Sequence, residues 1–188
     1  MKNFKNTEFV IVDVETTGLS PRFGDRIIEI AALKVKNLQP AERFVTFVDP
    51  QREISYGAFL VNRITPHMLK GAPKADTVMP EFLKFIGRTC LVGHNINFDL
   101  SFITYELGLL GLELGPRRTI LDTLRLSRNL LPDLGSYALR SVSYALGVEQ
   151  VQQHRAMADV EITCEVFRKL LEIADRRDIC ELEQLISL

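Results

Sequence analysis

Residues 9–19 of the chain read FVIVDVETTGL, an apolar run that gives way to two carboxylates, Asp13 and Glu15. A short continuous run of apolar, β-branched residues is typical of a buried strand, so we predict one over residues 8–14. Alternation along a strand puts Asp13 and Glu15 on one face, roughly 7 Å apart along the chain. Carboxylates this close repel each other unless a cation or a shared proton neutralises them. The pair therefore indicates either a solvated strand end or a cation site.

The composition is ordinary for a globular protein, with 46% apolar and 25% charged residues among 188. This length predicts one domain with a full hydrophobic core, and no apolar stretch approaches the ~20 residues that span a bilayer. Three scattered cysteines have neither metal-ligand spacing nor a disulfide pattern. We therefore expect a reduced cytoplasmic protein with no membrane partner. The net charge of −1 argues against a strongly basic face, so any contact with nucleic acid should be short and local.

The other apolar runs predict an α/β domain with a mixed sheet. Strands at 26–36 and 43–48 follow the first closely enough to form an antiparallel meander. Two shorter strands, at 90–92 and 119–121, then alternate with helices. Helices are expected after Thr65-Pro66, at 75–86, 99–110, 123–131, 138–146 and 156–174, with a short tail from Asp178.

Two further acids and a histidine lie at the polar ends of predicted elements. Asp99, in GHNINFDL, opens a helix just after the strand that ends at Gly93. Asp159, in QHRAMAD, follows His154 by five residues, which on a continuous helix would place the two side chains about 140° apart. We therefore place His154 in the loop before the helix and Asp159 in its second turn. Taken singly, each residue also suits a helix end or an exposed surface.

Together the acids indicate a site for hard cations. Strands that end at residues 14 and 93 can bring their carboxyl ends together, where open α/β sheets bind ligands. Clustered oxygen ligands select Mg²⁺ or Mn²⁺, and the lack of accompanying cysteine argues against structural zinc. Two such ions about 4 Å apart form the clamp used for in-line displacement at phosphorus. A histidine beside them can deprotonate the attacking water.

The segments VDVETTGL, GHNINFD and HRAMAD resemble, in order and spacing, the three exonuclease motifs of the DEDD family in its histidine subtype. The chain is similar to the DnaQ-like domains that form the proofreading epsilon subunit of bacterial DNA polymerase III. The resemblance covers residues 7–174 of a single exonuclease domain, 1–188, and leaves 175–188 as a helical tail. It implies a ribonuclease H-like fold, with a five-stranded mixed sheet flanked by helices. It also implies two divalent ions and stepwise 3′→5′ release of nucleoside 5′-monophosphates from single-stranded or frayed DNA.

The resemblance implies a role for each matched catalytic position. Asp13 would bridge both metal ions. Glu15 and Asp159 would complete the ion on the nucleophile side, and Asp99 would hold the second ion through water. His154 would be the general base.

Contacts to the 3′-terminal nucleotide are implied as well. Thr16 would meet it through its backbone, in a turn with free N–H groups, and Leu19 would wedge against its base. Where the epsilon subunit carries a glutamate and a histidine, this chain has Gly57, which cannot grip a hydroxyl, and Asn62, which can hydrogen-bond a sugar or phosphate. The other expected substrate contacts are Gly18, Asn95 and Phe98.

Three polar residues near these motifs are predicted to have structural roles. His94 and Asn95 would orient the turn before Asp99 rather than take part in the chemistry. Asp122 would cap the helix that begins at Thr123, since an N-cap carboxylate accepts a backbone N–H of the first turn.

Two other functions stay open. An RNA-trimming oligoribonuclease would resemble WIDxEMTGL in the first motif, but here Val12 precedes the aspartate, Thr16 follows the glutamate and the chain has no Trp. A catalytically idle nucleic-acid-binding module is disfavoured because all five catalytic positions are filled. The sequence does not separate proofreading beside a DNA polymerase subunit from repair or oligonucleotide turnover.

The tail ELEQLISL, residues 181–188, has two interpretations. The favoured one docks a short terminal helix on the core through its spaced apolar residues. The other notes that QLISL loosely resembles the Gln-Leu-x-Leu-Phe peptides with which bacterial replication proteins bind the sliding clamp. Ser187 and Leu188 replace the usual Leu-Phe pair, so this match is poor.

Overall fold

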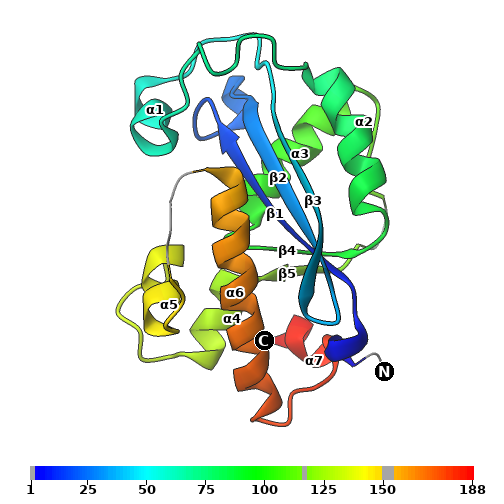
Figure 1. Ribbon diagram of the computed structural model, residues 1–188, viewed down its shortest axis with the longest axis vertical. Coiled ribbons are helices and arrows are strands. Elements are labelled where there is room, and N and C mark those ends of the chain that lie inside the picture. Colours follow the sequence, from blue (N-terminus) through cyan, green and yellow to red (C-terminus); the bar gives the residue numbers. More distant parts are fainter. Residues whose placement is uncertain (1–2, 116–117, 150–154) are drawn as a thin grey trace.

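A computed structural model describes residues 3–115, 118–149 and 155–188 of the chain. Five strands form one mixed sheet in the order β3-β2-β1-β4-β5 (Figure 1). The strands are β1 Phe9–Thr16, β2 Ile27–Lys36, β3 Gln39–Phe47, β4 Cys90–Gly93 and β5 Ile120–Asp122. β1, β2 and β3 pair in antiparallel fashion, whereas β4 runs parallel to β1 and β5 parallel to β4. The predicted meander followed by two further strands is confirmed.

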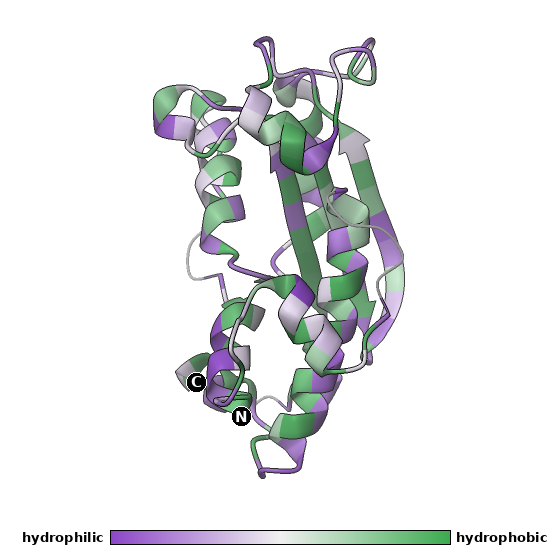
Figure 2. Ribbon diagram, turned by 90° about the vertical axis from the view of Figure 1, so that its left-hand side faces the viewer, coloured by the Kyte–Doolittle hydropathy of each residue, from purple (hydrophilic) through white to green (hydrophobic). Residues whose placement is uncertain are grey.

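Helices cover both faces of this sheet (Figure 1). The helices are α1 Tyr56–Asn62, α2 Ala75–Ile86, α3 Asn97–Leu109, α4 Thr123–Leu130, α5 Leu139–Ala145, α6 Ala156–Asp175 and α7 Leu182–Ser187, with single 3₁₀ turns η1 Phe4–Asn6 and η2 Pro21–Phe23. α2 and α3 pack on one face, and α4, α5, α6 and α7 pack on the other. Figure 2 shows hydrophobic residues along the central strands that these two layers enclose.

β1 is buried on both faces, as its apolar run predicts. Val10, Val12 and Val14 belong to the core shared with α2 and α3, whereas Phe9 and Ile11 belong to the core shared with α6. The ring of Phe9 packs edge-on against a phenylalanine of α6, at 5.0 Å between centroids. Because side chains alternate along a strand, Asp13 and Glu15 lie on the α6 face, just beyond Ile11.

Two local predictions are wrong. No helix follows Thr65: the chain instead makes successive i→i+3 turn bonds, from Met68 N–H to Thr65 O and from Lys70 N–H to His67 O, before Gly71 adopts a left-handed φ of 81°.

Helix α1 was not predicted from the sequence. It begins where the Ser55 side chain accepts the N–H of Ala58. β3 also starts four residues earlier than predicted, and its exposed first half carries a proline that an edge strand tolerates.

The tail forms a packed helix, as favoured. Leu182 and Leu185 of α7 lie in the core beneath α6, and Glu181 and Gln184 form a capping box at the start of α7. Leu185 is fully buried, so the helix gives no support to a clamp-binding peptide, which would have to be extended and accessible. Among the described helices, none has both the length and the apolar character needed to pass through a bilayer.

Candidate active site

Three predicted carboxylates meet at the end of β1. The carboxylate oxygens of Asp13, Glu15 and Asp159 lie within 4.8 Å of one another. Asp159 reaches them from the first turn of α6, because that helix begins at Ala156. The prediction of the second turn was therefore one turn too far along. His154 lies outside the described residues, so its role stays a prediction.

Asp99 joins this site from the other helical layer. It is the third residue of α3, two positions later in the helix than predicted, and is 4% exposed. Its Oδ1 accepts a hydrogen bond from the backbone N–H of Val14 at 3.0 Å. Val14 lies between Asp13 and Glu15 in β1, so this bond fixes the Asp99 side chain to that part of the strand. One hydrogen bond thus ties the start of α3 to the strand that carries two of the other acids.

The carboxylates destabilise one another's charge. Burial raises the pKa of Asp13 well above its usual range, and the charges of Asp99 and Glu15 raise it further. Burial, followed by the charges of Asp159 and Glu29, raises the pKa of Glu15 to about 8. Burial also raises the pKa of Asp99 to about 7, although the N–H of Val14 opposes that shift. Oxygen ligands whose negative charge is this unfavourable fit a site for hard divalent cations.

An ion pair beside the site, with a buried carboxylate and a partly exposed guanidinium, is not predicted by the sequence. Glu29 lies directly opposite Glu15 in the pairing of β1 with β2, and it is 2% exposed. Its carboxylate accepts two hydrogen bonds from the Arg155 guanidinium, at 2.8 and 3.1 Å, and one from the N–H of Ala156 at 3.1 Å. The pair therefore fixes the first residues of α6, three positions before Asp159. No local signal could reveal it, since Glu29 and Arg155 are 126 residues apart.

The turn after β1 is closed rather than open. The N–H of Thr17 donates to Arg26 O at 2.9 Å, so the expectation of a free N–H is wrong there. A Cβ on Gly18 would lie 2.3 Å from Oδ2 of Asp25, so this position requires glycine for close approach. Leu19 projects outward and is 86% exposed, which is compatible with the expected contact to a base.

Asn62 does not point at solvent. It is 2% exposed, its Nδ2 donates to Thr16 O at 3.2 Å and its Oδ1 accepts the N–H of Ile64 at 3.0 Å. The amide therefore holds the end of α1 against the end of β1. The Asn62 amide is therefore not available for the expected hydrogen bond to a sugar or phosphate. It instead holds the backbone of Thr16, the residue expected to meet the terminal nucleotide.

The residues around the second motif have the predicted structural roles. His94 is held by Thr123 Oγ1 and Tyr137 O, each at 2.9 Å from a ring nitrogen. Asn95 adopts a left-handed φ of 58°, and its N–H donates to Oδ1 of Asp122, which also caps α4. Phe98 packs against the ring of the next aromatic residue on α3, at 5.1 Å between centroids, and is partly exposed. The expected contacts of Asn95 and Phe98 with substrate stay predictions.

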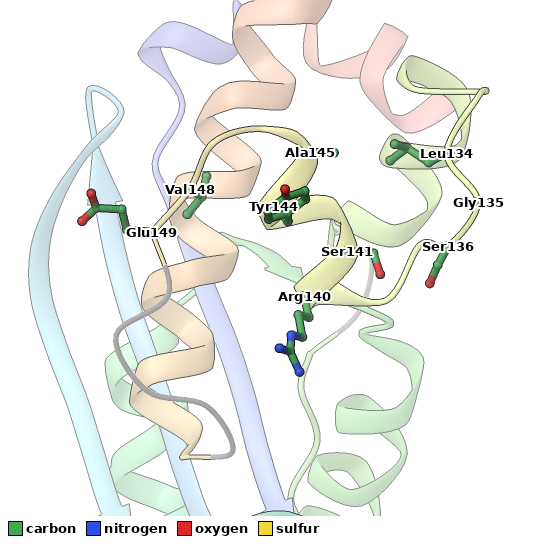
Figure 3. A pocket seen from close by; sticks show the side chains of 9 residues that line it. All are labelled: Leu134, Gly135, Ser136, Arg140, Ser141, Tyr144, Ala145, Val148 and Glu149. Atoms are coloured by element: carbon green, nitrogen blue, oxygen red, sulfur yellow. The ribbon is translucent and has the colours of Figure 1, made fainter.

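A cavity of about 930 Å³ is lined by α5 and by the segments before and after it (Figure 3). Its wall combines the apolar side chains of Leu134, Tyr144 and Val148 with the polar side chains of Arg140 and Ser136. None of the residues that line it belongs to the predicted site. The cavity is therefore a separate feature of the α5 surface.

The mixed sheet, its two helical layers and the acidic end of β1 define a protein with a ribonuclease H-like fold. The RNase_T family model, described as "Exonuclease", matches residues 10–167. The chain therefore belongs to this exonuclease family, and the resemblance inferred from the three motifs is confirmed.

Similar proteins include polymerases and a nuclease. The chain is 45% identical over 165 residues to a PolC-type DNA polymerase III of Caldanaerobacter subterraneus subsp. tengcongensis, which covers 88% of the chain and 12% of the polymerase. It is 38% identical over 164 residues to the "3'-5' exonuclease DinG" of Bacillus subtilis, covering 87% of the chain and 18% of that protein. The chain thus spans less than a fifth of either relative.

Solved structures share the fold. Exonuclease I of E. coli, in complex with a dT13 oligonucleotide, superposes with a TM-score of 0.81 at 22% identity, over 97% of this chain and 46% of that one. Exonuclease X, in complex with 5′ overhanging duplex DNA, superposes with a TM-score of 0.72 at 26% identity, over 95% and 98% of the two chains.

Proposed function

We propose that the protein is a metal-dependent 3′→5′ exonuclease that removes nucleoside 5′-monophosphates from single-stranded or frayed DNA. The observation that carries the proposal is the meeting of Asp13, Glu15 and Asp159 within 4.8 Å, with Asp99 fixed beside them. A relative named as a 3'-5' exonuclease and a fold relative that binds an oligonucleotide support the direction and the substrate. Residues 1–188 would form one such domain.

Each acid has a position suited to its proposed role. Bound Mg²⁺ or Mn²⁺, as two ions, would stabilise the attacking and leaving oxygens of the phosphodiester. The charges of both Asp99 and Glu15 act on Asp13, which suits a ligand shared by both ions. Glu15 and Asp159 would hold the ion on the nucleophile side, and Asp99 the other.

The proton from the attacking water would pass to His154. This requires the neutral imidazole, whose ordinary pKa of about 6.5 leaves it largely unprotonated at neutral pH. Arg155 follows immediately in the sequence and is anchored to Glu29, so the chain is fixed just beyond the proposed base.

The substrate is proposed to be a 3′ end that is already unpaired. With a net charge of −1 the chain has little general attraction for a duplex, so melting a paired end would be slow. The PolC-type relatives support a setting in which the enzyme acts beside a DNA polymerase subunit. A mismatched terminus would fray and enter the site, whereas a paired terminus would be cut more slowly.

The test compares Asp13→Asn with Asp178→Asn, which alters an exposed acid beyond the far end of α6. We expect the wild type and Asp178→Asn to release mononucleotides from 3′-labelled single-stranded DNA with Mg²⁺ or Mn²⁺, and Asp13→Asn to release almost none. Excess EDTA should stop the reaction, and a 5′ label should be retained on shortening products. Full activity in EDTA, or release that begins at the 5′ end, would rule the proposal out.

A further inference from the structure

The loop after β1 carries two large apolar side chains in solvent. Leu19 is 86% exposed and Phe23, the last residue of η2, is 88% exposed. Scattered exposed apolar residues are common on proteins and need no explanation. These two lie on one short loop that leaves the strand of Asp13 and Glu15, so their position calls for one.

Side-chain and backbone bonds hold this loop in a fixed shape. The carboxylate of Asp25 accepts hydrogen bonds from Thr17 Oγ1 at 3.2 Å and from the N–H of Ser20 at 3.1 Å. Arg52 lies 3.4 Å from the same carboxylate. The N–H of Phe23 donates to Ser20 O at 3.1 Å. These bonds hold Phe23 in solvent on a well-ordered loop. A partner that covers the ring would therefore pay little conformational entropy to order the loop.

The surroundings of Phe23 combine aromatic and basic side chains at the site's end of the molecule. The N–H of Ser55 donates to Thr17 O at 3.0 Å, which ties the segment before Tyr56 to the start of the same loop. Tyr56 is 75% exposed. Arg22, next to Phe23, is exposed as well. Figure 1 shows α1, the end of β1 and the start of α6 together at one end of the molecule. Aromatic rings interleaved with arginine are typical of surfaces that bind single-stranded nucleic acid.

We propose that Phe23 is a stacking platform for a base upstream of the 3′-terminal nucleotide. The inference rests on the proposed function and deepens it by naming where the single strand runs as it leaves the site. In this proposal Leu19, three residues after Thr16, meets the terminal nucleotide. Phe23, four residues further along the same loop, meets a base of an inner nucleotide. Every base has an aromatic face, so this contact would add affinity without sequence preference.

The absence of tryptophan from the chain makes a direct test possible. Phe23→Trp introduces a single tryptophan that preserves stacking and reports on it. Titration with oligo(dT) of roughly 12 nucleotides, protected by phosphorothioate linkages at its 3′ end, should quench this tryptophan. Leu109→Trp is the matched control: Leu109 is exposed at the far end of α3 from Asp99, and its emission should stay unchanged.

Phe23→Ala measures how much the ring contributes to the affinity for single-stranded DNA. Because stacking on one base strengthens binding about 5- to 150-fold, we expect Kd for the same oligonucleotide to rise by a factor in that range. The gain in affinity between a dinucleotide and the longer oligonucleotide should shrink in the same proportion. Leu109→Ala should bind like the wild type. Melting temperatures of the variants should match the wild type, since both side chains are exposed.

The outcomes separate this inference from the proposed function. If the wild type cleaves single-stranded DNA while Phe23→Ala binds it equally well and Phe23→Trp is not quenched, the stacking role is wrong and the nuclease stands. Phe23 would then face another partner, such as a protein. If the wild type neither binds nor cleaves single-stranded DNA, both the proposed function and this inference are wrong.

Discussion

Replacing Glu15 by Gln should stabilise the metal-free protein, although it removes a proposed metal ligand. Burial, with the charges of Asp159 and Glu29, raises the pKa of Glu15 from 4.5 to about 8. The folded protein therefore holds the Glu15 proton more tightly than the unfolded chain does. Below pH 4.5 the group is neutral in both states and carries no penalty. As pH rises through about 8 the proton is lost in the folded state as well, and the full cost of burying the charge appears.

The size of the effect follows from the pKa. One pKa unit corresponds to about 1.4 kcal/mol, so a shift of about 3.5 units sets an upper bound of roughly 5 kcal/mol above pH 8. Relaxation of the neighbouring side chains lowers this figure. We therefore expect Glu15→Gln to raise the free energy of unfolding by on the order of 2–4 kcal/mol at pH 8, or the melting temperature by roughly 5–15 °C.

The assay is thermal unfolding in EDTA from pH 5 to pH 9. Glu183→Gln, at an exposed position of α7, controls for the loss of a glutamate. The gap between Glu15→Gln and the wild type should widen with pH. Saturating Mn²⁺ should then stabilise the wild type more than the variant, because only the wild type keeps the full ligand set. The electrostatic reasoning would be refuted if the variant were less stable than the wild type in EDTA at pH 8. It would also be refuted if the difference in melting temperature between the two did not change with pH.

Three further predictions concern the residues around the carboxylates. Arg155→Ala leaves the buried carboxylate of Glu29 unpaired and should cost about 3–5 kcal/mol in urea unfolding, with Arg155→Lys less harmful; equal stability would show that the pair is unimportant. Gly18→Ala should lower the melting temperature because its Cβ meets a carboxylate at 2.3 Å, whereas Gly57→Ala, with nothing within 4 Å, should be neutral or stabilising. His154→Ala should lower kcat on the order of 10²–10⁴-fold, and loss of binding with unchanged kcat would make it a positioning residue.

The sequence predicts best those elements whose apolar residues form a clear run or a clear helical spacing. β4 and α2 lie where their apolar residues place them, and α2 has the predicted bounds of 75–86. β3 was predicted only in its second half, since its first residues are exposed and lack an apolar pattern. The turn after Thr65 was misread because a local N-cap and proline signal cannot show whether i→i+4 bonds follow.

The acids of the site could be predicted from the sequence, but the contacts that hold them in place could not. The three motifs named Asp13, Glu15, Asp99 and Asp159 from residue type and spacing, and the described geometry brings these four together. The Glu29–Arg155 pair was missed because it depends on the register between β1 and β2 and on where α6 begins. Neither is encoded by neighbours in the sequence. For the same reason, sequence alone could not show that the Asn62 amide is buried.

Glu29 helps to explain how a site with so much negative charge keeps its shape. Like charges directly opposite in a sheet are destabilising, and Glu29 lies opposite Glu15. Arg155 donates its hydrogen bonds to Glu29, so this carboxylate becomes a structural anchor. The charge of Arg155 only partly offsets the raised pKa of Glu15, and the pKa of Asp13 stays well above its usual range. The same Glu29 accepts the Ala156 N–H, as Asp99 accepts that of Val14. Two buried carboxylates thus fix the backbone at Val14 and at the start of α6, the two elements that carry Glu15 and Asp159. We therefore expect the proposed cation ligands to be in place before a cation binds.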